Sequence, residues 1–324
     1  MKIVVADIGG THARFALASI SPGRRPELGE MHRFRTREHV GLLSAWEAFR
    51  QEIGEELPRS AAIAVAAPIE GEVLRFMNSD WRISRFGLDR ELGLERLTLL
   101  NDFGAVAHAV SILDPAELAP ICGPDRLPAD AIVSVIGPGT GLGVAILDRR
   151  GGTTRVIETE AAHIGFAPLD PEERALAATI AAQYERASVE RIVSGPGLID
   201  IYRHLGGEAD WEANRAGELW SAAIDGTDRI AAQALDILVR SFGAAAGDIS
   251  LAHGAMGVAI TGGLANRIVD RLRSPAFTER FGAKGRYRER MRRVSVVLAT
   301  YAEPGLLGAA VAFKREHLTE MAPA

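Results

Sequence analysis

The chain has 324 residues, of which 47% are hydrophobic and 24% charged, and its formal net charge at pH 7 is -5. This composition is typical of a globular protein of about two domains, and the negative charge argues against nucleic acid as the main partner, because that binding needs a concentrated positive face. The single cysteine, Cys122, excludes an intrachain disulfide and a cysteine metal cluster. No apolar run approaches the roughly 18 residues of a membrane span, so we expect a cytoplasmic protein without a membrane partner.

The N-terminal third is predicted to alternate strands and helices. Apolar residues 3–6 and 13–18 flank Gly9, Gly10 and Thr11, a pattern that predicts a hairpin with no helix after the glycines. Further strands are predicted from compact apolar runs, and helices from apolar residues at helical spacing. These predictions cover a helix at residues 40–57, a strand at 61–67, extended pieces at 72–76 and 81–83, and a short helix at 88–92.

Residues 97–100 are predicted to form a strand covered on both faces, and residues 103–110 a helix. Asn101 and Asp102 lie between them, where the strand should end. Because ligands in open α/β sheets bind outside the carboxyl ends of strands, Asp102 is a candidate acceptor for a hydroxyl proton. The alternative is that Asp102 only caps the following helix, a position that Asp favours.

Residues 114–130 are marked by Pro and Gly and have the composition of a linker. After them the N-terminal pattern returns as a strand at 132–136, a glycine turn at 137–143 and a strand at 144–147. We interpret this as a weak internal repeat in which Gly139-Thr140 matches Gly10-Thr11. The remaining predictions are helices at 171–184, 197–204, 225–251, near 266 and at 304–317, and strands at 258–260 and 294–298.

The glycine turns suggest a phosphate cradle, because glycine lets backbone amides approach an anion closely. The sequence contains no Walker loop, no G-x-G-x-x-G spacing at 137–143 and no protein-kinase motif set. Tight turns are the alternative explanation for any single glycine pair. Two similar hairpins, each with a Thr, and a third pair at Gly262-Gly263 together favour the cradle.

The motifs at residues 7–11, 100–103, 137–143 and 260–263 resemble the phosphate, catalytic and adenosine segments of the sugar-kinase and actin ATPase superfamily. More closely, the chain resembles bacterial glucokinases, and the segments that carry this resemblance are 67–69, 78–81, 160–168, 189–198 and 303–309. The motifs run from residue 4 to about 312 and are specific in this order and spacing.

The resemblance implies an α/β protein of two ribonuclease-H-like (actin-like ATPase) domains with a cleft between them. The small domain would hold residues 1–110, completed by a C-terminal helix at 304–324, and the large domain residues 111–303. The implied reaction transfers the γ-phosphoryl group of ATP to the 6-hydroxyl of glucose with Mg²⁺. We also expect a homodimer, from the base rate for soluble proteins.

The resemblance also implies the site residues. Those expected to contact glucose, with Asp102 as the general base, are Asn101, Asp102, Glu160, His163 and Glu190. Those expected at the phosphates are Gly9, Gly10, Thr11, Gly139 and Thr140, with Gly262 and Gly263 near the adenosine. No residue is expected to bind the metal directly, although Asp7 is a candidate for a contact to Mg²⁺ through water. The chain departs from the family at His12, where Asn is usual, and at Ala161-Ala162, where Gly-Gly is usual.

The residue types suit these roles on chemical grounds. A primary alcohol is a poor nucleophile, so a carboxylate within hydrogen-bond reach should accept its proton. Glu160, Glu190 and Asn101 offer acceptors to a ring of sugar hydroxyls, and His163 either donates or accepts. Structural alternatives remain: a solvated strand-end charge for Glu160, a loop imidazole for His163 and helix surface for Glu190. For Asp7 the alternative is an Asx turn.

Other functions stay open at this stage. A kinase for another hexose or an amino sugar would use the same kinds of residues. A non-catalytic sugar-sensing protein would need a DNA-binding segment, for which we expect no room before the hairpin that begins by residue 3. An actin-like filament protein would not need the set Glu160, His163 and Glu190.

Overall fold

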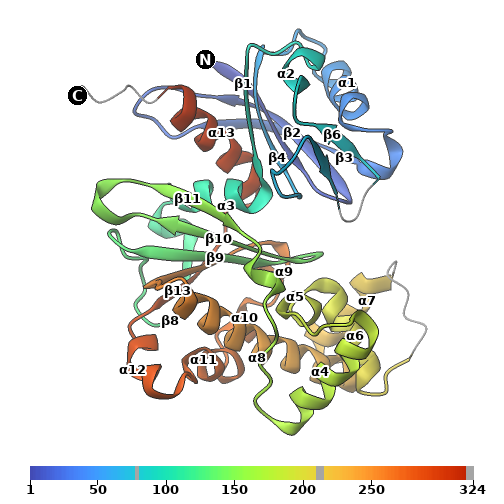
Figure 1. Ribbon diagram of the computed structural model, residues 1–324, viewed down its shortest axis with the longest axis vertical. Helices are drawn as coiled ribbons and strands as arrows, with labels where there is room; N and C mark the ends of the chain where they lie inside the picture. Colours follow the sequence, from blue (N-terminus) through green and yellow to red (C-terminus); the bar gives the residue numbers. More distant parts are fainter. Residues whose placement is uncertain (77–79, 209–214, 319–324) are drawn as a thin grey trace. The chain divides into compact units, whose positions relative to one another are not determined.

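The structure is a computed structural model that describes residues 1–76, 80–208 and 215–318. The chain divides into two compact units, which are described separately (Figure 1). Unit 1 comprises Met1–Leu113 and Tyr301–Ala324, and unit 2 comprises Asp114–Thr300. None of the helices in the described ranges combines the length and the apolar character that a membrane span requires.

Unit 1 is built on a five-stranded mixed sheet with the order β3-β2-β1-β4-β7. Its strands are β1 (Lys2–Ile8), β2 (His12–Ser19), β3 (Glu27–Arg35), β4 (Ser60–Val65) and β7 (Arg96–Asn101). The predicted hairpin is confirmed, because β1 and β2 pair antiparallel, and β4 and β7 then follow parallel to β1. The carboxyl ends of β1, β4 and β7 therefore lie at one edge of the sheet.

Helices cover both faces of this sheet (Figure 1). They are α1 (Leu42–Ile53), α2 (Leu88–Glu91), α3 (Asp102–Val110) and α13 (Pro304–His317). On the face of α1, Phe15 stacks on Phe49 with ring centroids 5.3 Å apart. On the other face, Phe313 of α13 packs in a cluster with Ile3 and Val5 of β1 and the alanines of β4. Gly308 brings α13 close to α3, since a Cβ there would overlap the carbonyl oxygen of Ala105.

A small hairpin of β5 (Val73–Arg75) and β6 (Arg82–Ser84) joins unit 1 beside β3. The buried Trp81 anchors it, because its indole N–H donates to the carbonyl oxygens of Thr36 (3.2 Å) and His39 (3.0 Å). The glucokinase-like segment 78–81 is described only at Asp80 and Trp81; Asn78 and Ser79 lie outside the described residues.

Unit 2 repeats the arrangement of unit 1. Its sheet has the order β11-β10-β9-β12-β13-β8, formed by β8 (Leu118–Cys122), β9 (Ile132–Pro138), β10 (Leu142–Asp148), β11 (Arg155–Thr159), β12 (Gly257–Ile260) and β13 (Ser295–Ala299). The hairpin β9-β10 is followed by parallel β12 and β13, as β1-β2 is followed by β4 and β7. The internal repeat is confirmed, and with it an α/β fold of two related sheets.

The prediction of a linker at residues 114–130 was wrong in part. Residues 118–122 form β8, which pairs antiparallel with β13 at the edge of the sheet and adds a strand that unit 1 does not have. Its sequence, Leu-Ala-Pro-Ile-Cys, contains a proline opposite Val297. Proline cannot donate a hydrogen bond to the sheet and is tolerated mainly on edge strands, so the composition concealed the strand.

The helices of unit 2 lie largely on one face of its sheet (Figure 1). They are α4 (Pro171–Tyr184), α5 (Val189–Ile192), α6 (Gly195–His204), α7 (Ala216–Asp225), α8 (Arg229–Ala252), α9 (Gly263–Arg267), α10 (Val269–Leu272), α11 (Pro275–Gly282) and α12 (Arg288–Met291). The long helix predicted from residue 225 begins later, at Arg229. Gly226, at φ 70°, ends α7, and the side chain of Asp228 caps α8 by accepting from the N–H of Ala231 at 2.9 Å.

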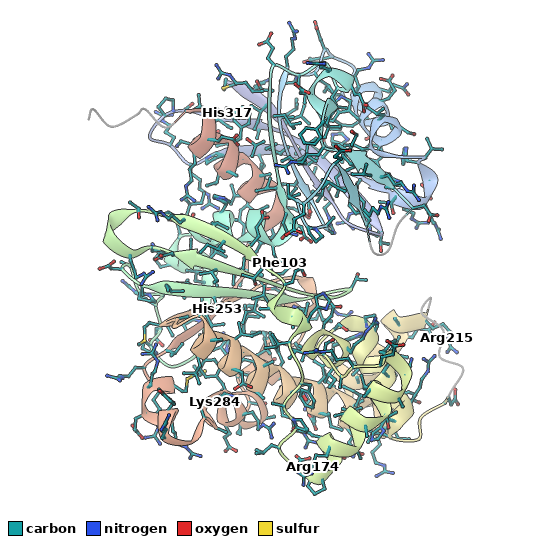
Figure 2. The ribbon with its side chains drawn as sticks, in the orientation of Figure 1. Phe103, Arg174, Arg215, His253, Lys284 and His317 are labelled. Atoms are coloured by element: carbon teal, nitrogen blue, oxygen red, sulfur yellow. The ribbon has the colours of Figure 1, made fainter. Side chains whose placement is uncertain are left out.

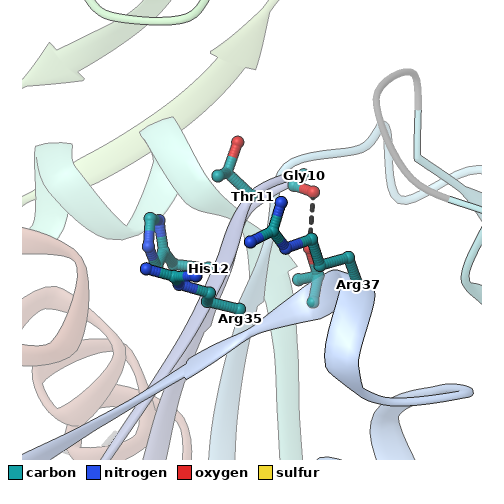
Figure 3. Close-up of a pocket in the computed structure, with 6 residues that line it drawn as sticks. Gly10, Thr11, His12, Arg35 and Arg37 are labelled. Carbon is teal, nitrogen blue, oxygen red and sulfur yellow. Dashed lines mark hydrogen bonds between the residues drawn. The ribbon is translucent and has the colours of Figure 1, made fainter. Parts of the chain in front are cut away.

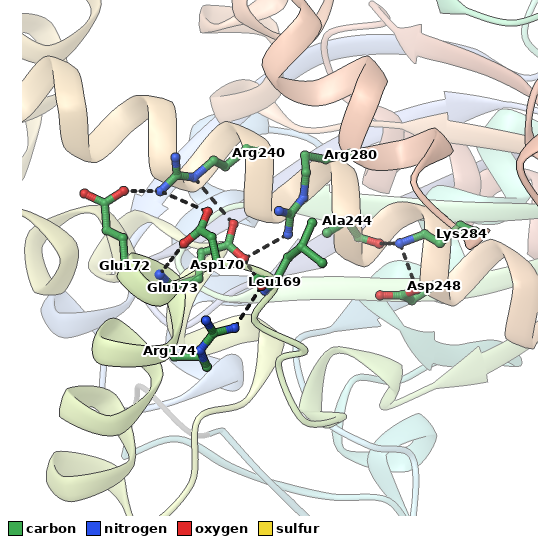
Figure 4. A network of polar contacts seen from close by, with 10 residues as sticks. All are labelled: Leu169, Asp170, Glu172, Glu173, Arg174, Arg240, Ala244, Asp248, Arg280 and Lys284. Carbon is green, nitrogen blue, oxygen red and sulfur yellow. Dashed lines mark hydrogen bonds and ion pairs between the residues drawn. The ribbon is translucent and has the colours of Figure 1, made fainter.

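A buried carboxylate fixes α4 against α8 and α11 (Figure 4). Glu173 of α4 is fully buried, and its oxygens lie 3.4 Å from Arg240 Nε and 2.9 Å from Arg280 Nη2. It also accepts from the N–H of Leu169 at 2.7 Å. Removing one partner of a buried ion pair costs about 3–5 kcal/mol, so this network holds the segment just after residues 160–168 in place.

Candidate active site

The first glycine turn connects β1 and β2 and is tied to the end of β3. The N–H of Gly9 donates to the carbonyl oxygen of His12 at 2.9 Å. The Thr36 hydroxyl donates to the carbonyl oxygen of Gly10 at 2.6 Å, and the Thr36 N–H donates to that of Thr11 at 3.1 Å. These bonds hold the turn in one conformation, with the side chain of Thr11 exposed.

Asp7 lies on β1 opposite Arg14 of β2. Arg14 Nη1 donates to Asp7 Oδ2 at 3.2 Å, and Arg14 Nε lies 3.6 Å from Glu303 Oε2, just before α13. Burial raises the pKa of the Asp7 carboxyl, against the lowering effect of Arg14. Gly305 permits this packing, because a Cβ there would lie 2.8 Å from Asp7 Oδ2.

Among the described residues, no three side chains of His, Cys, Asp or Glu gather as a metal site. Mg²⁺ typically keeps several waters and is held by substrate phosphates with one or two carboxylates. Asp7 is a carboxylate near the carboxyl end of β1.

Asn101 ends β7 and is the N-cap of α3. Its Oδ1 accepts from the N–H groups of Phe103 (2.8 Å) and Gly104 (3.3 Å), and its Nδ2 donates to the carbonyl oxygen of Ala67 at 3.3 Å. Asp102 is the first residue of α3, just before Phe103, which is labelled in Figure 2. The N-cap position is thus occupied by Asn101 and not by Asp102, for which the sequence had left it open as the alternative to a role as base.

The Asp102 carboxylate is half-buried at the carboxyl end of β7. Its Oδ1 accepts from the N–H of Phe103 at 2.8 Å, which fixes the carboxylate at the start of the helix. A helix N-terminus stabilises a negative charge. The position thus combines a fixed orientation with partial access to solvent, as an acceptor for a substrate proton requires.

In unit 2 the structure brings Glu160, His163 and Glu190 together. His163 Nε2 lies 3.6 Å from Glu160 Oε2, and His163 Nδ1 lies 3.9 Å from Glu190 Oε1. The side chains of Glu160 and His163 are 60% and 45% exposed, whereas that of Glu190 is 23% exposed. The set offers carboxylate acceptors on either side of an imidazole, which suits a ligand with several hydroxyl groups.

Glu190 is positioned by the second glycine turn. Its Oε2 accepts from the N–H of Leu142 at 3.0 Å. A Cβ on Gly141 would lie only 2.5 Å from the same oxygen. Gly141 therefore has a structural role that the sequence analysis missed; the signal was a third glycine directly after Thr140.

The alanines at 161 and 162 belong to a 3-10 turn that carries His163. Ala162 is 2% exposed and packs in the core of unit 2, and Ala161 packs against that core. The departure from Gly-Gly thus adds two methyl groups that anchor the loop. The loop is held further by the N–H of Val189, which donates to the carbonyl oxygen of Ile164 at 3.0 Å.

The second turn repeats the first in outline. The N–H of Gly139 donates to the carbonyl oxygen of Gly141 at 2.7 Å, and the carbonyl oxygen of Gly139 accepts from the N–H of Gly195, at the start of α6, at 2.7 Å. Gly262, at φ 100°, lies beside it, with its Cβ position 3.2 Å from the carbonyl oxygen of Pro138. The carboxyl ends of β9 and β12 therefore bring Gly139, Thr140 and Gly262 together.

A pocket of about 380 Å³ opens beside the first turn (Figure 3). Its walls are formed by Gly10, Thr11, His12, Arg35, Thr36 and Arg37. Sequence reasoning missed the two arginines. The alternation Arg33, Arg35, Arg37 was the available signal, but it gains meaning only once β3 is known to pair with β2.

Comparison with known proteins gives a consistent result over nearly the whole chain. The family model described as Glucokinase matches residues 4–316. A glucokinase of Zymomonas mobilis is 47% identical over 98% of this chain and 99% of its own, and one of Aromatoleum aromaticum is 42% identical over 95% and 93%. The crystal structure of a glucokinase from an Antarctic psychrotroph is similar with a TM-score of 0.81 at 30% identity, covering 97% of this chain and 99% of that one.

Proposed function

The chain belongs to the glucokinase family, and from this premise we propose how its residues transfer the γ-phosphoryl group of ATP to the 6-hydroxyl of glucose. Its activity is the phosphorylation of glucose. The observation that carries the assignment to particular residues is the gathering of Glu160, His163 and Glu190 in unit 2, next to the glycine turn of Gly139 and Thr140.

Glu160, His163 and Glu190 bind the hydroxyl groups of glucose. The carboxylates accept hydrogen bonds and the imidazole either donates or accepts. Asn101 contributes through its amide nitrogen, because its oxygen already accepts two helix N–H groups. A site built in this way rejects analogues that lack a hydroxyl, since its own polar groups would then be left unpaired.

Asp102 is the general base. As the 6-hydroxyl oxygen forms its bond to the γ-phosphorus, the proton of that hydroxyl passes to the Asp102 carboxylate. The bond from the γ-phosphorus to the β,γ-bridging oxygen breaks, and ADP leaves with the electron pair. Accepting this proton is the only bond-making step in which a protein side chain takes part. The rest of the catalysis consists of positioning and charge stabilisation.

The glycine turns hold the nucleotide. Gly9, Gly10, Thr11, Gly139 and Thr140 lie against the phosphates, and Gly262 and Gly263 lie at the adenosine. The backbone donors to the phosphates are the N–H groups of Gly10, Thr11 and Thr140, because those of Gly9 and Gly139 donate within their own turns. Mg²⁺, when bound with ATP, neutralises charge on the phosphate oxygens. Asp7 would be the residue that contacts that ion through a water molecule.

The remaining parts of the proposal concern the organisation of the molecule. Unit 1 corresponds to the small domain, completed by α13, and unit 2 to the large domain. We further propose a homodimer, and a cytoplasmic location because the donor is ATP.

A coupled ADP assay against a panel of hexoses tests the function. We expect ATP- and Mg²⁺-dependent turnover with glucose, and product identification by NMR as glucose 6-phosphate. Deoxyglucose analogues that lack a hydroxyl should lose much of their kcat/KM. Preferred turnover of another hexose or an amino sugar would favour the alternative kinase, and glucose binding without turnover would favour a sugar-sensing protein.

A further inference from the structure

The pocket beside the first glycine turn has two unlike walls, both within unit 1. One wall is the backbone of Gly10 and Thr11. The other carries the side chains of Arg35 and Arg37, which lie at the end of β3 and just beyond it. Thr36, between them, bonds to the carbonyl oxygens of both turn residues and so fixes the separation of the walls (Figure 3).

Positive charge accumulates at this pocket. In the ladder of β2 and β3, His12 lies directly opposite Arg35 and Arg14 lies directly opposite Arg33. Arg14 and Arg33 carry like charges at opposed positions, which destabilises an antiparallel pair. Burial, followed by the charges of the neighbouring arginines, lowers the pKa of His12, so its imidazole is neutral at neutral pH. The positive charge of such a cluster of guanidinium groups is compensated when an anion binds there.

The two pocket arginines are available for such an anion. The Arg35 guanidinium lies 3.7 Å from Glu38, and both side chains are 58% exposed, so this pair contributes little. Within the described ranges, no carboxylate lies within 4 Å of the Arg37 guanidinium. Arg14 differs from both, since it is held between Asp7 and Glu303.

We propose that Arg35 and Arg37, together with His12, bind the terminal phosphates of the donor on the β3 side of the Gly10-Thr11 turn. Guanidinium groups suit this task because they donate two parallel hydrogen bonds to a phosphate group. The inference rests on the proposed function in one respect, namely that the donor phosphates lie against this turn. It assigns donor recognition to residues outside the glycine motifs.

The test compares Arg35→Gln, Arg37→Gln and the double variant with the control Arg59→Gln. The control substitution removes one positive charge from the same unit. Arg59, however, lies just before the amino end of β4 and pairs with Glu95 at 2.9 Å, away from the pocket. Two quantities are measured: the KM for ATP and for glucose, and the affinity for inorganic tripolyphosphate by calorimetry. Thermal unfolding confirms that each variant is folded.

We expect each single variant to raise the KM for ATP and weaken tripolyphosphate binding about tenfold, as for loss of one charge-assisted contact. The double variant should show a larger rise in the KM for ATP and a larger loss of tripolyphosphate affinity than either single variant. The KM for glucose should stay within about twofold of wild type, and Arg59→Gln should behave as wild type. Arg37→Lys should restore part of the loss, because it keeps the charge without the paired donors. Wild-type tripolyphosphate affinity in the double variant, or an equal rise in both KM values, would overturn the inference.

The same experiment separates this inference from the proposed function. Tripolyphosphate binding requires neither glucose nor turnover. Arginine-dependent binding in a chain that phosphorylates no sugar would support the inference and refute the function. Glucose phosphorylation with an unchanged KM for ATP in the double variant would support the function and refute the inference.

Discussion

Gly141 shows how a single hydrogen atom determines the geometry of the sugar site. Its Cβ position lies 2.5 Å from Glu190 Oε2 and 3.2 Å from Glu190 Cδ, distances that real Cβ atoms do not tolerate without movement of the neighbour. Gly141→Ala should therefore push the Glu190 carboxylate away from the N–H of Leu142. We expect the KM for glucose to rise about tenfold, the cost of one lost or misplaced hydrogen bond to a charged group.

Gly217→Ala is the matched control for this prediction. Gly217 lies in α7, has no heavy atom within 4 Å of its Cβ position and does not contact the site. Steady-state kinetics of both variants with glucose varied at saturating ATP measure the effect. An unchanged KM for glucose in Gly141→Ala would mean that the position of Glu190 does not matter for sugar binding.

At the level of single residues, the resemblance named Glu160 and His163 from one motif and Glu190 from another. The structure brings these three side chains together because residues 164–166 pair with residues 187–189, and their contact with the sugar stays a prediction. The roles of Arg35, Arg37 and Gly141 were not predictable in this way. Each depends on two segments that only the fold brings together. For Arg35 and Arg37 these are the end of β3 and the first glycine turn, and for Gly141 they are the second glycine turn and α5, which carries Glu190.

The contact between α3 and α13 includes a histidine with a pH-dependent role. His108 Nδ1 accepts from Arg315 Nη1 at 2.9 Å, and Arg315 Nη2 donates to the hydroxyl of Ser111 at 2.9 Å. Burial, followed by the charge of Arg315, lowers the pKa of His108 to about 4. The neutral imidazole is thus the form that stabilises the packing of the two helices.

This pKa predicts how stability changes with pH. In the unfolded chain His108 titrates near 6.5, so as the pH falls the unfolded state takes up the proton first. The contribution of His108 to the free energy of unfolding is complete above about pH 6.5, decreases through the acid range and is lost near pH 4. By pH 5 the loss is on the order of 2 kcal/mol.

Urea unfolding at pH 7 and pH 5 measures the effect, with His108→Gln for comparison. Glutamine can still accept a hydrogen bond from Arg315 but does not titrate. The variant should therefore lose less stability than wild type between the two pH values. An identical loss in both proteins would show that His108 is not responsible for the decrease.

At the level of elements, compact apolar runs were predicted reliably. The short elements β5, β6 and α2 were also predicted, whereas the polar strand β3 and the four-residue helices α5 and α12 were not. The strands β1, β4, β9 and β12 were predicted because each contains a compact run of apolar residues. In the structure these residues are almost entirely buried. The sequence of β3, Glu-Leu-Gly-Glu-Met-His-Arg-Phe-Arg, is mostly exposed and gave no strand signal. Helices of four residues, such as α5 and α12, are shorter than the window in which helical periodicity can be detected.

At the level of the whole molecule, the repeat of a glycine hairpin followed by parallel strands organises both units. The same strand order places the carboxyl ends of β1 and β9, and the turns after them, at equivalent positions of the two sheets. The sequence predicted this repeat from the glycines and threonines alone. It missed β8, which makes the second sheet larger than the first.

The proposed roles of the site residues make the account testable with one substitution. In that proposal the hydroxyl groups of glucose are bound by Glu160, His163 and Glu190, whereas Asp102 accepts the proton. Asp102→Asn keeps an oxygen that can accept from the N–H of Phe103 but removes the ability to take a proton at neutral pH. Binding and catalysis should therefore respond differently in this variant.

The most direct measurement is the rate of glucose 6-phosphate formation by Asp102→Asn with saturating ATP, Mg²⁺ and glucose, together with calorimetric glucose binding to the same protein. We predict a rate about a hundred- to ten-thousandfold below wild type, as for loss of a general base, with glucose affinity retained. A rate close to that of wild type would contradict the assignment of Asp102, and with it the proposed mechanism.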